Sequence, residues 1–325
     1  MEHSFTRPPN VPITHHHLLD LNAWTAEEIH TVFNTADEMA QILQRRVRKA
    51  PALQGFTVCS LFFENSTRTS MSFERAAKAL SADVLSFRAK SSSLSKGESL
   101  KDTLRTIEAY QADLYIVRHN ASGVPYQLTR WTDACIVNAG DGRRAHPTQA
   151  LLDAFTFRTT FPNFDGFEGK KLTIVGDITH SRVARSNLRL WTKLGASVTI
   201  CGPRSLCPAS LADTPNVTLS HNLSEAVEGA HAVMAVRIQH ERMQNSLFPS
   251  LAEYQARYQV THDIMKQAHP DALVMHPGPM NRDVEISGAL ADAEHSVIEQ
   301  QVANGVPVRM AVLYTLLVGS RQKAD

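Results

Sequence analysis

The sequence predicts an α/β protein of two domains, each with a central mainly parallel sheet flanked by helices. Short apolar runs rich in Val, Ile and Leu alternate with segments of helical periodicity, which is typical of βα units. The 325 residues exceed the usual size of one compact core. A hydrophobic content of 43% and a charged content of 20% indicate an ordinary globular chain that buries a sizeable core.

The apolar runs and the periodic segments between them define the expected elements. Strands are predicted over residues 57–63, 83–87, 113–117, 135–137, 171–175, 197–201, 217–219, 232–236 and 272–275. The clearest helical patterns cover residues 25–48, 100–112, 148–159 and 182–194. The last apolar segment, residues 305–317, predicts a buried helix with Pro307 near its first turn.

The domain boundary is expected after residue 149. Residues 160–169 break the helical periodicity and precede a new strand, which indicates that a second α/β unit begins there. We therefore expect a first domain over residues 1–149 and a second over residues 150–305. The C-terminal helix, residues 306–325, is expected to pack back on the first domain.

Composition excludes several classes of partner. A net charge of +1 does not suggest a nucleic-acid or membrane-surface partner. The N-terminus lacks the apolar core of a signal peptide, and no stretch approaches a membrane span by sequence inspection. Four scattered cysteines without a CxxC pair fit a reducing cytoplasm.

Two motifs that resemble ligand sites are set aside. The run His15-His16-His17 has no second ligand cluster, and its consecutive side chains point in different directions, so it does not predict a metal site. Gly176-Asp177 follows a strand, but no GxGxxG pattern accompanies it, which argues against a nicotinamide cofactor. We expect neither a metal nor another cofactor.

The turn after the first strand predicts an anion site. Ser66-Thr67-Arg68-Thr69-Ser70 lies between an apolar run and a helical segment, so it forms the N-terminus of a helix. Free backbone N–H groups and the positive end of the helix dipole attract a phosphate there. The alternative is that Ser66 or Thr67 only caps the helix.

Polar residues also follow the other strands of the predicted sheets. In open parallel sheets, ligands bind beyond the carboxyl ends of the strands. The residues at these ends are Arg118, Asn138 to Gly142 with His146 and Gln149, Asp177 with Arg182, Arg237 with Gln239, and His276 to Pro279. Together with Arg68, the arginines among these make four at the same edge of the two sheets. They would repel each other without anions between them, so the pattern favours a ligand with phosphate or carboxylate groups. His146 is open to a catalytic or a structural interpretation, and so is His276.

The sequence resembles the aspartate/ornithine carbamoyltransferase family along nearly its whole length. Phe63 to Ser70 is similar to the family's carbamoyl-phosphate signature, and Asn138 to Gly142 with His146 to Gln149 is similarly specific. Ornithine enzymes of the family carry Arg after Ser-Thr-Arg-Thr and a late His-Cys-Leu-Pro motif. This sequence has Ser70 and His276-Pro277-Gly278-Pro279 instead, which favours aspartate as the acceptor. Gly278 departs from the Leu that some members carry.

The resemblance implies a carbamoyltransferase-like fold and a role for each matched residue. Carbamoyl phosphate would be bound by Ser66, Thr67, Arg68, Thr69, Arg118, His146, Gln149, Pro277, Gly278 and Pro279. Aspartate would be bound by Lys96, Arg182, Arg237 and Gln239. The catalytic contacts would come from Thr69, Arg118, His146 and Lys96.

The implied reaction is carbamoyl transfer from carbamoyl phosphate to L-aspartate, in de novo pyrimidine (UMP) biosynthesis. Lys96 and Ser92 resemble residues that reach into a neighbouring subunit's site, which implies a homotrimer with shared active sites. Regulatory chains or a dihydroorotase are further partners that the resemblance leaves open. The alternatives are a carbamoyltransferase for another amine, such as ornithine, and an inactive scaffold subunit of a pyrimidine-synthesis complex.

Overall fold

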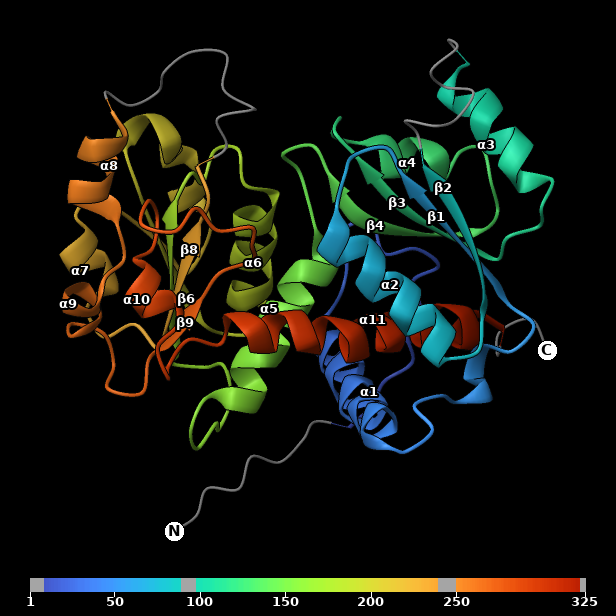
Figure 1. Cartoon of the computed structure of the whole chain (residues 1–325), viewed down its shortest axis with the longest axis horizontal. Coiled ribbons are helices and arrows are strands. Elements are labelled where there is room, and N and C mark those ends of the chain that lie inside the picture. The colour runs from blue at the N-terminus through green and yellow to red at the C-terminus, as the bar shows by residue number, and fades with distance from the viewer. Residues whose placement is uncertain (1–8, 89–97, 239–249, 322–325) are drawn as a thin grey trace. The chain divides into compact units, whose positions relative to one another are not determined.

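The computed structural model describes residues 9–88, 98–238 and 250–321. It contains a four-stranded and a five-stranded sheet, both parallel (Figure 1). The chain divides into two compact units, which we call the N-terminal unit (residues 7–151 and 302–325) and the central unit (residues 152–301). The predicted fold class is confirmed, with helices flanking a parallel sheet in each unit.

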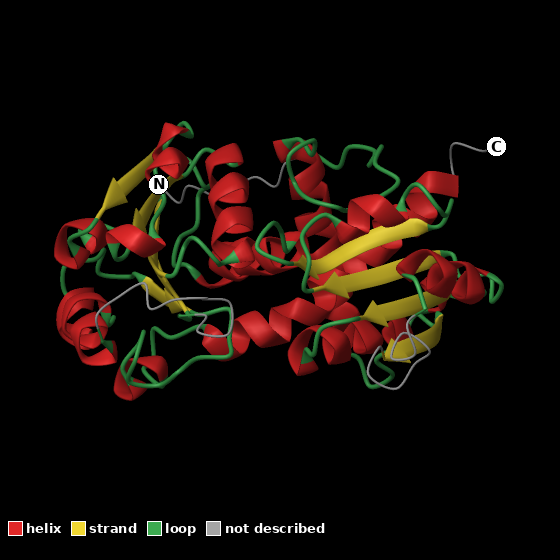
Figure 2. Ribbon diagram, turned by 90° about the horizontal axis from the view of Figure 1, so that it is seen from above, coloured by secondary structure: helices red, strands yellow, loops and turns green. Residues whose placement is uncertain are grey.

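The sheet of the N-terminal unit has the strand order β2-β1-β3-β4. Its strands are β1 (Thr57–Phe62), β2 (Asp83–Arg88), β3 (Leu114–His119) and β4 (Cys135–Asp141), and Figure 2 shows their arrows pointing the same way. All four were predicted, but β3 and β4 extend two and four residues beyond their predicted ends. Arg118 lies inside β3, and residues 138–141 continue β4 because they are fully buried and pair onward with β3.

Helices cover both faces of this sheet. They are α1 (Ala26–Gln44), α2 (Thr67–Ala79), α3 (Leu100–Glu108), α4 (Val124–Leu128) and the larger part of α11 (Ile298–Arg321), with a short 3-10 turn at Pro51–Leu53. Apolar residues of α3 and α4 pack with Leu61 and Tyr115 on one face. In α11, the Arg309 guanidinium lies 4.9 Å from the ring centroid of Phe73 in α2. Thr25 and Glu28 form a capping box that begins α1.

The central unit has the strand order β7-β6-β5-β8-β9. The strands are β5 (Lys171–Gly176), β6 (Ser197–Cys201), β7 (Val217–Ser220), β8 (Ala232–Val236) and β9 (Leu273–Met275), and all five were predicted. Gly176 ends β5 opposite Val236 with a φ of +133°. A Cβ there would lie 2.3 Å from the Val236 carbonyl oxygen, so the close approach of β5 and β8 requires glycine.

Two clusters of side chains cover the central sheet. One joins Val175, Val233 and Val274 of the strands to apolar residues of α7, α8 and α10. The other is aromatic: the ring centroids of Phe157 and Trp191 lie 4.8 Å apart. The helices are the end of α5 (Pro147–Thr160), α6 (Arg182–Lys193), α7 (Leu223–Val227), α8 (Leu251–Tyr258), α9 (His262–Met265) and α10 (Gly288–Ala291), with 3-10 turns at Arg204–Leu206 and Ala209–Asp213.

The C-terminal helix differs from its prediction. It begins at Ile298, so Pro307 lies inside it rather than near its first turn. Burial of its apolar residues outweighs the one backbone hydrogen bond that proline removes. Its stretch Ile298–Val318 is long and apolar enough to cross a membrane, which the sequence inspection missed, but 72% of the apolar window is buried inside the protein.

The run of histidines near the N-terminus makes three separate contacts. His15 Nε2 lies 3.1 Å from Glu28, His16 Nε2 lies 2.8 Å from the Asp133 carbonyl oxygen, and His17 Nδ1 accepts a 3.1 Å hydrogen bond from the N–H of Ile136. Burial, with a smaller contribution from His16, lowers the pKa of His17 from 6.5 to about 4. These histidines tie the N-terminal segment to α1 and β4.

Substitution of Gly176 by Ala should destabilise the protein by about 3 kcal/mol or more, because strain at this φ adds to the clash with Val236. Urea unfolding monitored by circular dichroism measures the effect. The matched control is Gly229→Ala, since Gly229 has a φ of +63° and nothing within 4 Å of its added Cβ. That control should lose only about 1 kcal/mol, and equal losses would contradict the close-approach explanation.

Stability should fall as the pH drops from 7 towards 4, in part through His17. The unfolded chain binds a proton at His17 below pH 6.5, whereas the folded chain resists it down to about pH 4. In His17→Asn, where the amide oxygen can still accept from Ile136, the loss between pH 7 and pH 5 should be smaller by about 1 kcal/mol, allowing for partial exposure. Parallel pH profiles of unfolding free energy in the two proteins would refute this.

Candidate functional site

Each sheet has one point at which the strand order reverses. In the N-terminal unit β1 lies between β2 and β3, and in the central unit β5 lies between β6 and β8. From β1 the chain continues to β2 on one side of it and later returns to β3 on the other side. From β5 it likewise continues to β6 and later returns to β8 on the other side. The loops separate at such a switch point and leave a crevice beyond the carboxyl ends of the two adjacent strands. Ser66 to Thr69, Arg118, Arg182 and Arg237 lie at the ends of these strands, whereas His146, Gln149 and the Pro277–Pro279 loop follow the neighbouring strands β4 and β9.

The turn after β1 forms the N-terminus of α2, as predicted. Ser66 is the N-cap residue, and its Oγ accepts a 3.4 Å hydrogen bond from the N–H of Thr69. Ser66 therefore caps the helix, and capping is compatible with anion binding because further N–H groups of the first turn lack intrahelical partners. Arg68 is exposed and Thr69 is buried.

Arg118 connects this turn to β4. It lies in register with Phe62 of β1, near the end of β3. Its Nη1 donates to the Ala139 carbonyl oxygen at 3.1 Å and to Thr69 Oγ1 at 3.4 Å, and its Nε lies 3.6 Å from a Glu64 carboxylate oxygen. The structure therefore brings Arg118 and Thr69 together at the switch point of the N-terminal sheet.

His146 and Gln149 lie at the start of α5, just beyond β4. Both are buried, and the His146 carbonyl oxygen accepts from the N–H of Gln149 at 3.0 Å. The fully buried Asp141 carboxylate holds the preceding loop, accepting from Asn138 Nδ2 at 2.9 Å, the N–H of Ala145 at 3.1 Å and the N–H of Gly123 at 2.6 Å. Asp141 belongs to the sequence motif Asn138 to Gly142, but nothing in the sequence indicates that its carboxylate holds this loop.

In the central unit, Arg182 and Arg237 lie at the ends of the two strands that flank the switch point. Arg182 is the first residue of α6 and is 5% exposed, and Arg237 directly follows β8 and is half-buried. Asp177, at the end of β5, accepts from the N–H of His180 at 3.0 Å and lies 2.9 Å from its Nδ1. Ser181 caps α6.

The loop after β9 is held by a buried histidine. His276 Nδ1 accepts a 2.8 Å hydrogen bond from the N–H of Gly278, so the ring proton lies on Nε2, which is 3.1 Å from Glu285 Oε1. This supports the structural interpretation of His276. Gly278 has a φ of +61°, which favours glycine between Pro277 and Pro279.

Three sequence-predicted residues, Ser92, Lys96 and Gln239, lie outside the described residues. Arg68 and Arg118 belong to the N-terminal unit, and Arg182 and Arg237 to the central unit. That these four share one crevice stays a prediction. Within the described ranges, no group of three or more His, Cys, Asp or Glu side chains is arranged to hold a metal ion.

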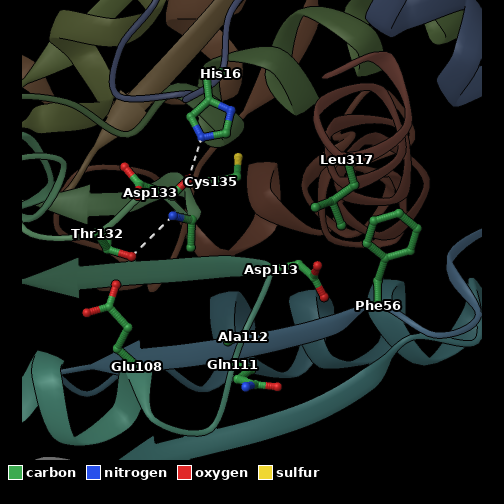
Figure 3. A pocket seen from close by; sticks show the side chains of 11 residues that line it. His16, Phe56, Glu108, Gln111, Ala112, Asp113, Thr132, Asp133, Cys135 and Leu317 are labelled. Atoms are coloured by element: carbon green, nitrogen blue, oxygen red, sulfur yellow. Dashed lines mark hydrogen bonds between the residues drawn. The ribbon is translucent and has the colours of Figure 1, made fainter. Parts of the chain in front are cut away.

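A cavity of about 340 Å³ lies at the opposite edge of the N-terminal sheet, near the amino ends of β3 and β4 (Figure 3). Its lining contains none of the sequence-predicted site residues. The side chains around it are His16, Phe56, Glu108, Gln111, Ala112, Asp113, Thr132, Asp133, Ala134, Cys135 and Leu317. Because ligands of parallel sheets bind at the carboxyl edge, this cavity is not the candidate site.

Burial keeps the thiols of the chain in their neutral form. All four cysteines are free and buried. Burial raises the pKa of Cys59, Cys201 and Cys207 to about 12, and it raises that of Cys135 as well. A thiolate nucleophile is therefore not available to the chemistry of this site.

Two family models match the chain. The model described as "Aspartate/ornithine carbamoyltransferase, carbamoyl-P binding domain" matches residues 16–159, and the model described as "Aspartate/ornithine carbamoyltransferase, Asp/Orn binding domain" matches residues 168–316. An aspartate carbamoyltransferase catalytic subunit of Deinococcus radiodurans is 56% identical over 303 residues, covering 93% of this chain and 96% of the relative. The corresponding subunit of Thermus aquaticus is 56% identical over 303 residues, covering 93% and 98%.

Solved structures share the fold. The aspartate transcarbamoylase of Trypanosoma cruzi in complex with N-(phosphonacetyl)-L-aspartic acid has a TM-score of 0.84 and 27% identity, covering 96% of this chain and 99% of its own. The ornithine carbamoyltransferase of Thermus thermophilus has a TM-score of 0.82 and 24% identity, covering 94% and 100%. The second comparison bears on the fold alone.

Proposed function

The chain belongs to the aspartate/ornithine carbamoyltransferase family, and from this premise we propose that it transfers the carbamoyl group of carbamoyl phosphate to the amine of L-aspartate. The products are N-carbamoyl-L-aspartate and phosphate. The curated relatives with 55–56% identity are named aspartate carbamoyltransferase catalytic subunits. Their name also supports a place in de novo pyrimidine biosynthesis.

The contact of Arg118 with Thr69 is the observation that carries this function in the structure. It joins a guanidinium to the first turn of α2 at a sheet switch point, where backbone N–H groups and the helix dipole already favour a phosphate. We assign the phosphate to Ser66, Thr67, Arg68 and Thr69. The carbamoyl amide is assigned to Gln149 and to the backbone of the Pro277–Pro279 loop.

We assign the two carboxylates of aspartate to the arginines of the central unit. Arg182 would bind the α-carboxylate, and Arg237 with Gln239 the β-carboxylate. A planar guanidinium holds a carboxylate through two parallel hydrogen bonds, which makes arginine well suited to both positions. A cationic acceptor such as ornithine would be disfavoured beside two arginines.

The chemistry requires no covalent enzyme intermediate. The deprotonated amine of aspartate attacks the carbonyl carbon, a C–N bond forms, and the C–O bond to phosphate breaks as the tetrahedral oxyanion collapses. Thr69, Arg118 and His146 would donate to the developing negative oxygen, and losing one such donor typically lowers the rate about a hundredfold to a thousandfold. The leaving phosphate is the proposed acceptor of the amine proton.

An inactive scaffold is the rival from another class. A scaffold would need only the packed core, whereas Arg68, Arg118, His146, Arg182 and Arg237 are all present at the carboxyl edges of the two sheets. We also propose a cytoplasmic homotrimer with shared active sites. The resemblance of the Lys96 segment supports the trimeric assembly, and the four free thiols support the cytoplasmic location. Regulatory chains and a dihydroorotase remain candidate partners.

Removal of either central-unit arginine should affect aspartate selectively. In Arg182→Ala and Arg237→Ala, we expect KM for aspartate to rise at least about tenfold, because a charged hydrogen bond is lost. Affinity for carbamoyl phosphate, measured by calorimetry without aspartate, should change less than about threefold. Arg185→Ala, on the same helix, is the control. An equal weakening of aspartate use and carbamoyl-phosphate binding would refute the assignment. So would a wild-type protein that carbamoylates ornithine but not aspartate.

Hybrid trimers should test the shared site. Lys96→Ala and His146→Ala subunits are each expected to be nearly inactive alone. Mixing them after reversible dissociation should restore activity, since some sites then combine an intact Lys96 with an intact His146. Differently tagged subunits allow hybrids to be isolated, and wild-type subunits treated identically serve as the control. Isolated hybrids without any recovered activity would remove the shared-site proposal.

A further inference from the structure

A chain of buried hydrogen bonds in the central unit centres on Asp153 of α5. Its Oδ1 accepts from Gln301 Nε2 of α11 at 2.7 Å, and its Oδ2 accepts from Asn187 Nδ2 of α6 at 2.7 Å. Asp153 and Asn187 have no exposed surface, and Gln301 is 2% exposed. One carboxylate therefore joins three helices that are distant in sequence.

From Gln301 the chain continues to the loop after β9. Gln301 Oε1 accepts a 2.9 Å hydrogen bond from the backbone N–H of His276. The His276 ring in turn accepts from the N–H of Gly278, and Glu285 Oε1 accepts from the N–H of Asn281 at 2.7 Å beside that ring. Gln301 thus accepts from the N–H of His276, and His276 and Glu285 in turn accept from the N–H groups of Gly278 and Asn281, on either side of Pro279.

From Asn187 the chain continues along α6. Asn187 Oδ1 accepts from Trp191 Nε1 at 3.2 Å, and Trp191 is fully buried in the aromatic cluster with Phe157. Arg182 is the first residue of the same helix. The rotation of α6 about its axis, which aims Arg182, is therefore coupled to Asp153.

Both carboxyl oxygens of Asp153 act as acceptors, which makes these contacts directional. A carboxylate only accepts hydrogen bonds, so both amides must turn their NH₂ groups towards Asp153. Their oxygens then necessarily face the other way, Gln301 towards the N–H of His276 and Asn187 towards the indole N–H of Trp191. A buried carboxyl group needs such bonds to satisfy its oxygens.

We propose that Asp153 is a positioning residue that sets the Pro277–Pro279 loop and the Arg182 end of α6 through the two amides. This inference rests on the proposed function, in which the loop and Arg182 contact the substrates. Asp153 itself has no role in contacting substrate. It acts by fixing which end of each amide faces its neighbour.

The test is Asp153→Asn, which keeps the shape but places an NH₂ group where one of the two neighbouring amides needs an acceptor. We expect the aspartate KM to rise about tenfold or more, because a buried hydrogen bond is lost and its donor is left without an acceptor, while kcat changes less. Amide hydrogen exchange at His276, Gly278, Met280 and Asn281 should accelerate about tenfold or more. The exchange readout does not depend on activity.

The double variant Asp153→Asn with Asn187→Asp should rescue both readouts to within about threefold of wild type. In it, the amide at position 153 can donate to the carboxylate at position 187 and still accept from Gln301. The control is Thr173→Val, which removes a buried 2.7 Å hydrogen bond to the Ala226 carbonyl oxygen in the same unit. It should leave the aspartate KM unchanged.

The outcomes separate the two proposals. Three results would each overturn the positioning role. Asp153→Asn could leave both the exchange rates and the aspartate KM unchanged, its exchange could be no faster than that of Thr173→Val, or the double variant could fail to rescue it. If the wild-type protein does not use aspartate but Asp153→Asn still accelerates exchange and the swap rescues it, the proposed function fails while the coupling of Asp153 to the loop stands.

Discussion

The placement of Arg118 is the constraint on which the N-terminal unit depends. Its guanidinium is fixed by the Ala139 carbonyl oxygen and by Thr69 Oγ1, and so it ties the ends of β3 and β4 to the first turn of α2. A positive charge held beside a helix N-terminus creates a strong local preference for an anion. Parallel strand order makes this possible, because only adjacent carboxyl ends can bring the three segments together.

In the central unit, it is close packing of the backbone that brings the polar residues together. Gly176 and Val236 approach so closely that no side chain fits between them, and the residues that follow the two strands, Asp177 and Arg237, are thereby brought to one edge. Asp177 then organises the turn into α6 by accepting from His180. Backbone packing at the switch point thus decides where the polar groups of this unit stand.

The sequence predicted the elements well because β-branched runs and helical periodicity are local signals. All nine strands in the described part of the chain were predicted, and the polar residues at their ends pointed to the carboxyl edges. The errors arose where burial overrides a local signal. Residues 138–141 were expected beyond the end of a strand but continue β4, and Pro307 was expected near the first turn of its helix but lies inside α11. The roles of the site residues came from resemblance rather than from these signals.

The buried hydrogen bonds around Asp153 could not be predicted from the sequence, for a different reason. Gln301 and Asp153 are 148 residues apart, and neither residue type indicates which side chain it will hydrogen-bond. Their bond depends on the packing of α5 against α11, which only tertiary structure supplies. An apolar pair could fill the same space, and could do so with similar stability. It would not, however, orient the Gln301 amide towards His276. The buried carboxylate is therefore better explained by the direction that it imposes than by the stability that it adds.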